Sequence, residues 1–448
     1  MKKARSLLFF KFSCSVFLLI ICGFSQLSAK LHYWAPPDGM GTESDPYQIS
    51  TLDNLRWLAE NSDYWSSENY YILTKDIDAA KTKTTPVTPI GNSSITFKAT
   101  FHGAGHKIKN LYMNDSSTNY IGLFGCVGSI IDSLGVTNSN ITGNEGVGAI
   151  AGYLANGQIN YCFATDDTVT GKSSENSCAG IIAGWTEYGN INGCFASGII
   201  TAAGKGCGGI VGWQRGNVCN CYARATVNGT SRYGGISGFI YSGVDSNCYS
   251  ASKIDTSGSD KGGIVGLIES ILILPIVKSY NGTINSCFWD TSLCSGIIDS
   301  FATGKSTTEM QTQSTYTDSG WDFTNLWVIS SDKNDNYPGF IWYNTIDSLD
   351  SITTGTIKSA IRTNTIQNFG MERMQNGKVQ LIVPDNEFPT LRLFSMNGKM
   401  LMTKHLSAGR TIIDVNAMHL PNGFYIMRMQ GKTMVAGQKI FVSGNPGK

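Results

Sequence analysis

The sequence has only five histidines, and they are scattered along the chain as His32, His102, His106, His405 and His419. No His-Glu-x-x-His motif occurs, so a zinc peptidase is not supported. No Gly-x-Ser-x-Gly motif lies between a strand and a helix, and no P-loop lysine follows the glycines. We therefore predict no catalytic residue, no metal site and no cofactor.

Charged residues and proline are also scarce, at 15% of the chain and 11 residues, whereas glycine is abundant with 51 copies. This balance favours turns and β structure. Lysine and arginine exceed acidic residues only from Gly355 onward, by twelve to four. The preceding region is acidic and would repel phosphate, so we expect no nucleic-acid partner.

No hydrophobic run is long enough to span a bilayer. The longest run near the start extends from Phe12 to Cys22, after four basic residues, and Leu27-Ser28-Ala29 offers a small-residue cleavage site. This pattern is typical of a signal peptide over residues 1–29, and it predicts export.

A glycine-framed apolar phrase recurs six times between residues 120 and 267. The closing glycines of the six copies are 26 to 32 residues apart, which indicates a stacked array of repeats. The copies end at Gly125, Gly152, Gly184, Gly212, Gly238 and Gly266.

A second phrase follows most closing glycines, as in Ile159-Asn-Tyr-Cys162-Phe163 and Ile191-Asn-Gly-Cys194-Phe195. The asparagine, glycine and serine residues in its centre favour a turn, because they tolerate a left-handed backbone or form hydrogen bonds with their own main chain. Each phrase therefore predicts a strand, a tight corner and another strand. We expect an all-β fold, a parallel β-helix, with Cys194, Ala196 and Ile199 facing inward.

Ten cysteines remain after removal of the leader. Five of them share one repeat position that leucine holds in earlier copies, so they are interpreted as buried hydrophobes: Cys162, Cys194, Cys221, Cys248 and Cys287. Disulfides are the alternative in an exported protein. The pairs considered are Cys178 with Cys207, which are interpreted as sharing a second repeat position, and Cys287 with Cys294.

The inward register of the cysteines leaves one aromatic residue per rung on an outer line, beginning at Tyr112. Such a row is a candidate ligand-binding surface for a glycan or a surface protein. The other interpretation is that a long loop between repeats covers the row and makes it a second core. The candidate binding residues are Phe163, Phe195, Tyr222, Tyr249 and Phe288.

The glycine phrases resemble the GLUG-motif repeat of bacterial surface and secreted proteins. Segments flanking the repeats are similar to that family's framing, with a short helix after Ser50 that caps one end and a closing unit from Cys287 to Trp342. The resemblance implies a GLUG-repeat β-helix with capping segments over residues 30–342.

A different pattern of short alternating strands follows a Thr/Ser-rich linker, residues 343–366. Residues 367–448 resemble the C-terminal sorting domain of type IX secretion cargo, through Asn397-Gly398-Lys399 and Leu420-Pro-Asn-Gly423-Phe-Tyr425. The resemblance implies a small β-sandwich that the type IX machinery recognises. The protein is then secreted or held at the cell surface of a Gram-negative bacterium, after passage through the periplasm.

These patterns predict an exported, non-catalytic repeat protein, either an adhesin-like binding module or a structural one. The alternative is a β-helix carbohydrate-active enzyme of the lyase or hydrolase class, which needs paired carboxylates. Asp166, Asp167, Asp245 and Asp255 occupy different repeat positions, so we do not expect them to converge.

Overall fold

The computed structural model describes residues 34–343, apart from 173–174, 203, 205, 256, 270–281, 295 and 332, and strands between Gly370 and Val442. The predicted signal peptide, residues 1–29, lies outside the described residues. So do residues 344–366 of the predicted linker.

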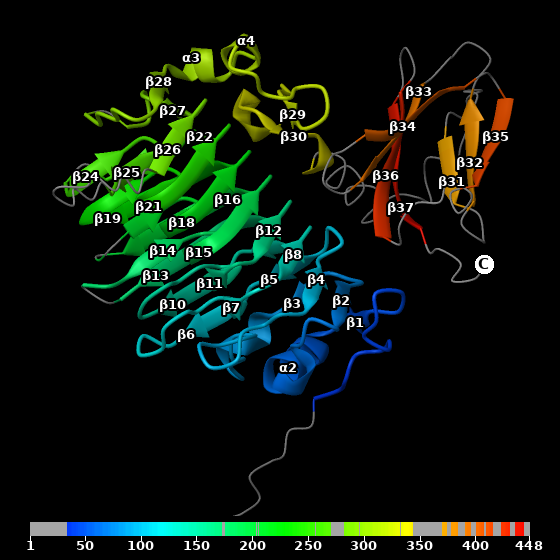
Figure 1. The fold of residues 1–448 in the computed structure, drawn as a ribbon, viewed down its shortest axis with the longest axis horizontal. Helices are drawn as coiled ribbons and strands as arrows, with labels where there is room; N and C mark the ends of the chain where they lie inside the picture. The colour runs from blue at the N-terminus through cyan, green and yellow to red at the C-terminus, as the bar shows by residue number, and fades with distance from the viewer. Residues whose placement is uncertain are drawn as a thin grey trace, which may run out of the picture.

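Short parallel strands between Tyr47 and Lys305 stack one rung above another, as Figure 1 shows from blue to yellow-green. Three parallel sheets make the sides of this coil, which confirms the predicted parallel β-helix. Sheet A contains β1 (Tyr47–Ile49), β2 (Tyr70–Leu73), β4 (Thr100–His102), β7 (Phe124–Val127), β8 (Ile130–Asp132), β11 (Ala151–Ala155), β12 (Gln158–Asn160), β15 (Ala183–Asn192), β18 (Val211–Cys219), β21 (Ser237–Ser246), β25 (Val265–Ile268) and β26 (Gly282–Asn285).

Sheet B follows sheet A across the corner of each rung. Its strands are β3 (Ile77–Asp78), β5 (Lys107–Lys109), β6 (Tyr112–Asn114), β9 (Gly135–Thr137), β10 (Asn140–Gly143), β13 (Phe163–Gly171), β16 (Phe195–Ala202), β19 (Tyr222–Gly229), β22 (Tyr249–Ser250), β23 (Lys253–Ile254), β27 (Phe288–Asp290) and β28 (Thr303–Lys305). The short sheet C closes the coil with β14 (Cys178–Gly180), β17 (Gly206–Gly208), β20 (Ser231–Gly234) and β24 (Ser259–Gly262).

The framing glycines are needed where backbones approach closely. A Cβ added to Gly208 would lie 2.1 Å from the carbonyl oxygen of Val211, and one added to Gly212 would lie 2.4 Å from the nitrogen of Ala179. Any larger side chain would therefore push sheet C away from sheet A.

The corner between sheets A and B is a single residue in left-handed conformation. Asn220 and Asn247 both have φ of 51°, which asparagine tolerates better than most residues. Asn220 Nδ2 also donates to Asn192 Oδ1 of the rung before, at 2.9 Å. The turn chemistry read from the second phrase is confirmed.

Cys194 and Ala196 face the core, as predicted, but Ile199 does not. Ile199 is 49% exposed and Ile200 is fully buried instead. Strand β16 alternates without interruption, so Ile200, four residues after Ala196, faces inward and Ile199 faces outward. The extra residue of the bulge lies in β13 instead, between Ala164 and Asp167.

The two ends of the coil are closed by different means. Helix α2 (Leu52–Glu60) packs Leu55 and Leu58 onto the first rung, and its N-cap is Thr51 rather than the predicted Ser50. Thr51 forms a capping box with Asn54. At the other end are α3 (Thr307–Met310), α4 (Ser314–Thr317) and an antiparallel pair, β29 (Trp327–Val328) and β30 (Gly339–Phe340).

The C-terminal strands form two antiparallel sheets of their own. One contains β31 (Gly370–Arg373), β32 (Lys378–Val383) and β35 (Gly409–Asp414), and the other contains β33 (Thr390–Ser395), β34 (Met400–His405), β36 (Gly423–Gln430) and β37 (Val435–Val442). The predicted strands are present, whereas the expected hairpin turn at residues 396–399 lies outside the described residues.

Candidate functional site

The predicted aromatic row runs up sheet B, and we call it the sheet B row. Parallel pairing places successive rings directly above one another. Ring centroids are 5.2 Å apart for Phe163 and Phe195, 4.9 Å for Phe195 and Tyr222, and 5.0 Å for Tyr222 and Tyr249, with interplanar angles of 5–7°. Phe288 continues the row in register above Tyr249.

Tyr112 does not belong to this row. It pairs with Asn140, whereas the position below Phe163 is held by Gly135. The ring of Phe163 lies over that glycine, 2.4 Å from where a Cβ would stand. The sheet B row therefore begins at Phe163.

All five rings of the sheet B row are buried, with at most 5% of each residue exposed. They pack against the segment that closes the coil, residues 310–343, through Met310, Tyr316, Trp321, Trp327, Tyr337 and Phe340. The row thus forms a second core, as the covering interpretation proposed, but the cover follows the last repeat instead of lying between repeats. No ring face of this row is open to a ligand while residues 310–343 lie on it.

Polar contacts hold residues 310–343, which we call the cover, against the coil. Tyr249 Oη donates to Pro338 O at 2.6 Å and accepts from Asn334 Nδ2 at 2.8 Å. Tyr337 Oη donates to the buried carboxylate of Asp290 at 2.5 Å, and Arg224 forms an ion pair with Asp335. Asp335 thus helps to hold the cover against the coil.

Inside the coil, the predicted cysteine ladder consists of buried thiols. Each backbone N–H approaches the sulfur of the next rung, at 3.4 Å from Cys162 N to Cys194 Sγ and from Cys194 N to Cys221 Sγ. Each thiol in turn donates to a carbonyl, such as Asn160 O for Cys162 at 3.2 Å. All ten cysteines among the described residues are free.

The two disulfide pairs considered from spacing are not formed. Cys207 pairs with Ala179, one residue away from Cys178. Cys178 therefore packs outside the coil against Trp213 and Phe239, whereas Cys207 faces the main core. The predicted alignment of the two cysteines was wrong by one residue. Because successive side chains of a strand point to opposite faces, the two sulfurs lie on opposite sides of sheet C.

Asp245 lies in the interior of the coil, where Ile191 and Val218 stand in the two rungs before it. Its Oδ1 accepts from Gln214 Nε2 at 2.8 Å, and its Oδ2 is 2.8 Å from Ser237 Oγ. Ser237 Oγ is also 2.7 Å from Gln214 Oε1. The hydroxyl has one hydrogen for two acceptors.

Both contacts of Ser237 are favourable only if Asp245 carries a proton, donates it to Ser237 Oγ and leaves the hydroxyl hydrogen for Gln214. Gln214 cannot be flipped, because its Nε2 also donates to Gly216 O at 3.1 Å. Burial raises the pKa of Asp245 to about 7, in agreement with a neutral acid.

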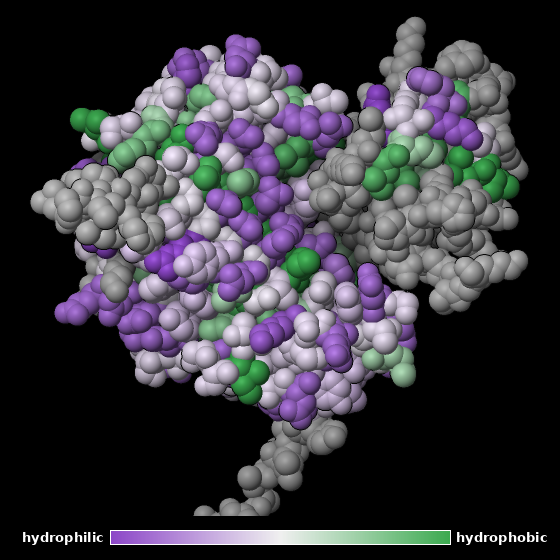
Figure 2. Space-filling model, viewed as in Figure 1, coloured by the Kyte–Doolittle hydropathy of each residue, from purple (hydrophilic) through white to green (hydrophobic). Residues whose placement is uncertain are grey.

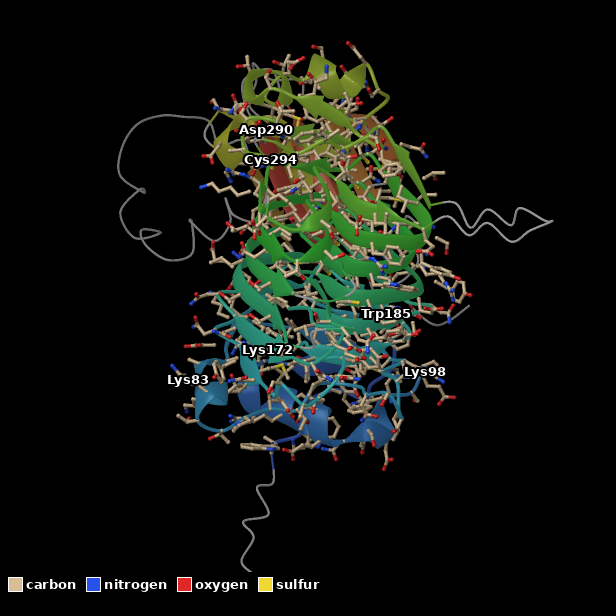
Figure 3. The ribbon with its side chains drawn as sticks, turned by 90° about the vertical axis from the view of Figure 1, so that its left-hand side faces the viewer. Lys83, Lys98, Lys172, Trp185, Asp290 and Cys294 are labelled. Atoms are coloured by element: carbon tan, nitrogen blue, oxygen red, sulfur yellow. The ribbon has the colours of Figure 1, made fainter. Side chains whose placement is uncertain are left out.

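A second aromatic row, which sequence reasoning missed, runs up the outer side of sheet A. We call it the sheet A row, and it consists of Tyr153, Trp185, Trp213 and Phe239, paired rung to rung. Centroids are 6.3 Å apart for Tyr153 and Trp185 and 4.3 Å for Trp185 and Trp213. Tyr153 and Trp185 are half-buried, whereas Trp213 and Phe239 are buried. Figure 3 shows Trp185 on the flank of the coil opposite Lys172.

Charged and phenolic groups surround the sheet A row. The Arg215 guanidinium forms an ion pair with Glu187 and lies 4.4 Å from the ring centroid of Tyr241 and 5.3 Å from that of Tyr188. Tyr188 is 60% exposed. The sheet A row and these four residues form what we call the binding face.

The signal for the sheet A row was present in the sequence. Each of its members follows a closing glycine directly, after Gly152, Gly184, Gly212 and Gly238. Each strand of sheet A continues past its closing glycine, so the aromatic residue that follows stands on the strand.

The candidate carboxylates and histidines do not form a catalytic group. Asp245 lies in the interior behind sheet A, whereas Asp166 and Asp167 are on β13 of sheet B. Asp255 accepts from Ser257 N in its own turn. His102 pairs with Asp132 and His106 with Asp76. In the described part of the chain, no three His, Cys, Asp or Glu side chains are grouped to hold a metal.

Among the described residues, no helix is sufficiently long and apolar to cross a membrane. The space-filling view in Figure 2 shows a solenoid surface that is mostly hydrophilic or neutral, with small separate hydrophobic patches.

Similarity to known proteins is clearest for the fold. A crystal structure from Bacteroides ovatus, provisionally named an immunoglobulin A1 protease, matches with a TM-score of 0.51 and 24% identity, over 68% of this chain and 95% of that one. At this identity the likeness concerns the fold alone.

Two curated relatives share about a third of the chain. Halomucin of Haloquadratum walsbyi is 31% identical over 146 residues, which is 30% of this chain and 2% of halomucin. A protein of Evansella cellulosilytica, provisionally named a Gly-rich membrane protein, is 31% identical over 163 residues, or 34% of this chain and 18% of that protein. The chain thus spans a small part of these relatives.

Residues 375–443 match the family model of the secretion system C-terminal sorting domain. This match covers every strand of the two antiparallel sheets except β31, and it implies type IX secretion with the type IX machinery as partner. The chain is therefore an exported protein, secreted or at the cell surface, whose passenger is a parallel β-helix.

Proposed function

We propose that this chain is a non-catalytic binding protein that holds a glycan at the cell surface through the binding face on sheet A. The carrying observation is the register of the sheet A row, which places one aromatic ring on each rung beside Arg215, Glu187 and two tyrosines. The half-buried rings of Tyr153 and Trp185 offer apolar surface to the faces of sugars, and the charged and phenolic groups beside them meet hydroxyls. The GLUG character of the repeats remains a prediction.

The shape of the binding face favours an extended chain over a globular partner. The sheet A row is one ring wide and runs along the axis of the coil, whereas a stable protein interface buries about 800 Å² on each side. An extended peptide is recognised mainly by main-chain hydrogen bonds at a sheet edge. Strands β15, β18 and β21 are paired on both sides, so they present faces and not edges.

The enzyme alternative has less support. A carbohydrate-cleaving β-helix needs two carboxylates that converge on one glycosidic bond. Of the candidates, Asp167 is buried, and Asp245 is buried on the other side of the coil. Incubation of the chain with a bound glycan should leave the glycan's length unchanged, and release of shorter products would favour the enzyme.

Glycan-array screening of the purified full chain, followed by calorimetric titration, tests the proposal. We expect a glycan ligand whose affinity falls about tenfold in Trp185→Ala, the effect of losing one stacked ring and its area. Phe301→Ala is the matched control, because Phe301 is 47% exposed but lies outside the binding face. Absence of any glycan ligand, or equal affinities of Trp185→Ala and the native chain, would show that the proposal is wrong.

A further inference from the structure

A cleft of about 430 Å³ lies on sheet B beside the covered row. Its floor is formed by outward side chains of β13, β16, β19 and β23, and its walls include Leu293 and Asn334 from the segment that follows the repeats. The edges of Phe195 and Tyr222 reach this cleft, although their faces are covered. The cleft is thus shaped by the cover and the coil together.

Hydroxyl groups and cations alternate along the floor of the cleft. Ser197 pairs with Arg224 in the next rung, and Thr226 pairs with Lys253 in the next rung. Thr165 completes the lining on β13. Hydroxyls beside aromatic edges and small apolar side chains, such as Ala251, suit the mixed surface of a sugar ring.

Two cations line the cleft, and no carboxylate is among its lining residues. Arg224 is held in place, because its Nη1 donates to Asn334 Oδ1 at 3.0 Å and its Nη2 meets Asp335. Lys253 is exposed. The negative charge of Asp335 offsets the positive charge of Arg224. The charge of Lys253 is not offset in this way, so the cleft has a net charge of plus one.

We propose that this cleft binds a carboxylated sugar unit of an acidic glycan, with Lys253 and the held guanidinium of Arg224 facing its carboxylate. The hydroxyl floor meets the sugar hydroxyls, and the ring edges with Leu293 meet its apolar side. This site is separate from the binding face on sheet A and does not depend on it.

The test uses the purified full chain and a trisaccharide of galacturonate, with a trisaccharide of galactose as the uncharged counterpart. We expect titration to show binding of the acidic trisaccharide only, weaker by about tenfold in Lys253→Gln and weaker at higher salt. Lys172→Gln is the matched control, since Lys172 is exposed and does not line the cleft. Trp185→Ala should leave this affinity unchanged.

A second variant separates charge from shape. Thr226→Trp fills the cleft without removing a cation and should also abolish binding, with an unfolding midpoint close to that of the native chain. Inorganic phosphate should bind far more weakly than the acidic trisaccharide, because it does not use the ring edges. The proposal is overturned if the acidic trisaccharide does not bind, if Lys172→Gln matches Lys253→Gln, if Trp185→Ala alone removes binding, or if phosphate binds equally well.

Discussion

Sheets A and B of the same coil both carry one aromatic ring per rung, yet their rings serve different ends. The sheet B row is stacked face to face and sealed under residues 310–343, where it adds a second core. The sheet A row is partly exposed and lies among arginine, glutamate and tyrosine side chains. An aromatic residue that recurs once per repeat therefore identifies the repeat but does not show whether the ring is structural or binds a ligand. That depends on whether a segment distant in sequence covers the ring.

The two rows should differ most in how much stability is lost when one ring is removed. Phe195→Ala should lower the free energy of unfolding by about 3–5 kcal/mol, because it leaves a cavity between two stacked rings and the cover. Trp185→Ala, at a half-buried ring, should cost clearly less. Urea unfolding followed by tryptophan fluorescence and circular dichroism measures both, and equal losses would contradict the distinction between the rows.

The interiors behind the two sheets differ as well, since the core behind sheet A contains the acid Asp245 and the ladder beside sheet B contains thiols. The pKa of Asp245 is raised to about 7 in the fold, from an ordinary value of 3.8. Between these values the unfolded chain has lost its proton and the folded chain retains it, so this group lowers stability as pH rises from about 4 to 7.

Three pH units at about 1.4 kcal/mol each make this loss up to about 4 kcal/mol. Asp245→Asn keeps the shape and cannot ionise, so its advantage over the native chain should grow from pH 4 to pH 7 and then level off. Unfolding midpoints measured across that range test this. A constant difference between the two proteins would show that Asp245 is already ionised at pH 4.

An arginine on each sheet offers a matched comparison. Arg224 lies over Tyr337 and bonds Asn334, so it joins the cover to the coil. Arg215 instead contacts residues of its own rung and of the two neighbouring rungs. Arg224→Met should cost about 1–2 kcal/mol and make the segment 310–343 more sensitive to limited proteolysis. Arg215→Met should cost less than about 1 kcal/mol and leave the protease pattern unchanged. Identical protease patterns for the two variants would contradict the proposal that Arg224 joins the cover to the coil.

The smallest expected effect concerns thiol access. Cys219 is half-buried on the outer side of β18, where Ser246 Oγ donates to its sulfur at 3.2 Å, whereas the ladder thiols are buried. Burial raises the pKa of Cys162, Cys221 and Cys248, which keeps them as unreactive thiols. Maleimide labelling read by mass spectrometry should modify Cys219 first and the ladder only after unfolding. Early labelling of Cys221 would argue against a closed interior.

Much of the coil could be predicted because its rules are local. The glycine phrases, the left-handed corner at Asn220 and the inward cysteines follow from steric limits that act within one rung. The inward position of Ile200 also follows from local alternation in β16, whereas the extra residue in β13 that turns Val169 inward depends on the neighbouring rung and could not be predicted.

The candidate site was less predictable for a related reason. The sequence shows that Tyr249 alternates out of the core, but its contact with Pro338 spans 89 residues and follows from no periodicity. Conversely, Trp185 and Trp213 stand in a repeat position that the sequence displays plainly, and only the course of the strand past Gly184 and Gly212 makes them a row.

The position of the cover along the chain imposes an order on assembly. Residues 310–343 come after every ring of the sheet B row, so a chain made or threaded from its N-terminus has all five rings before it has the segment that hides them. A truncated chain that ends before Met310 would expose a continuous row of aromatic side chains along one side of the coil. Completion of the closing segment, and not of the repeats alone, is therefore the event that buries the sheet B row.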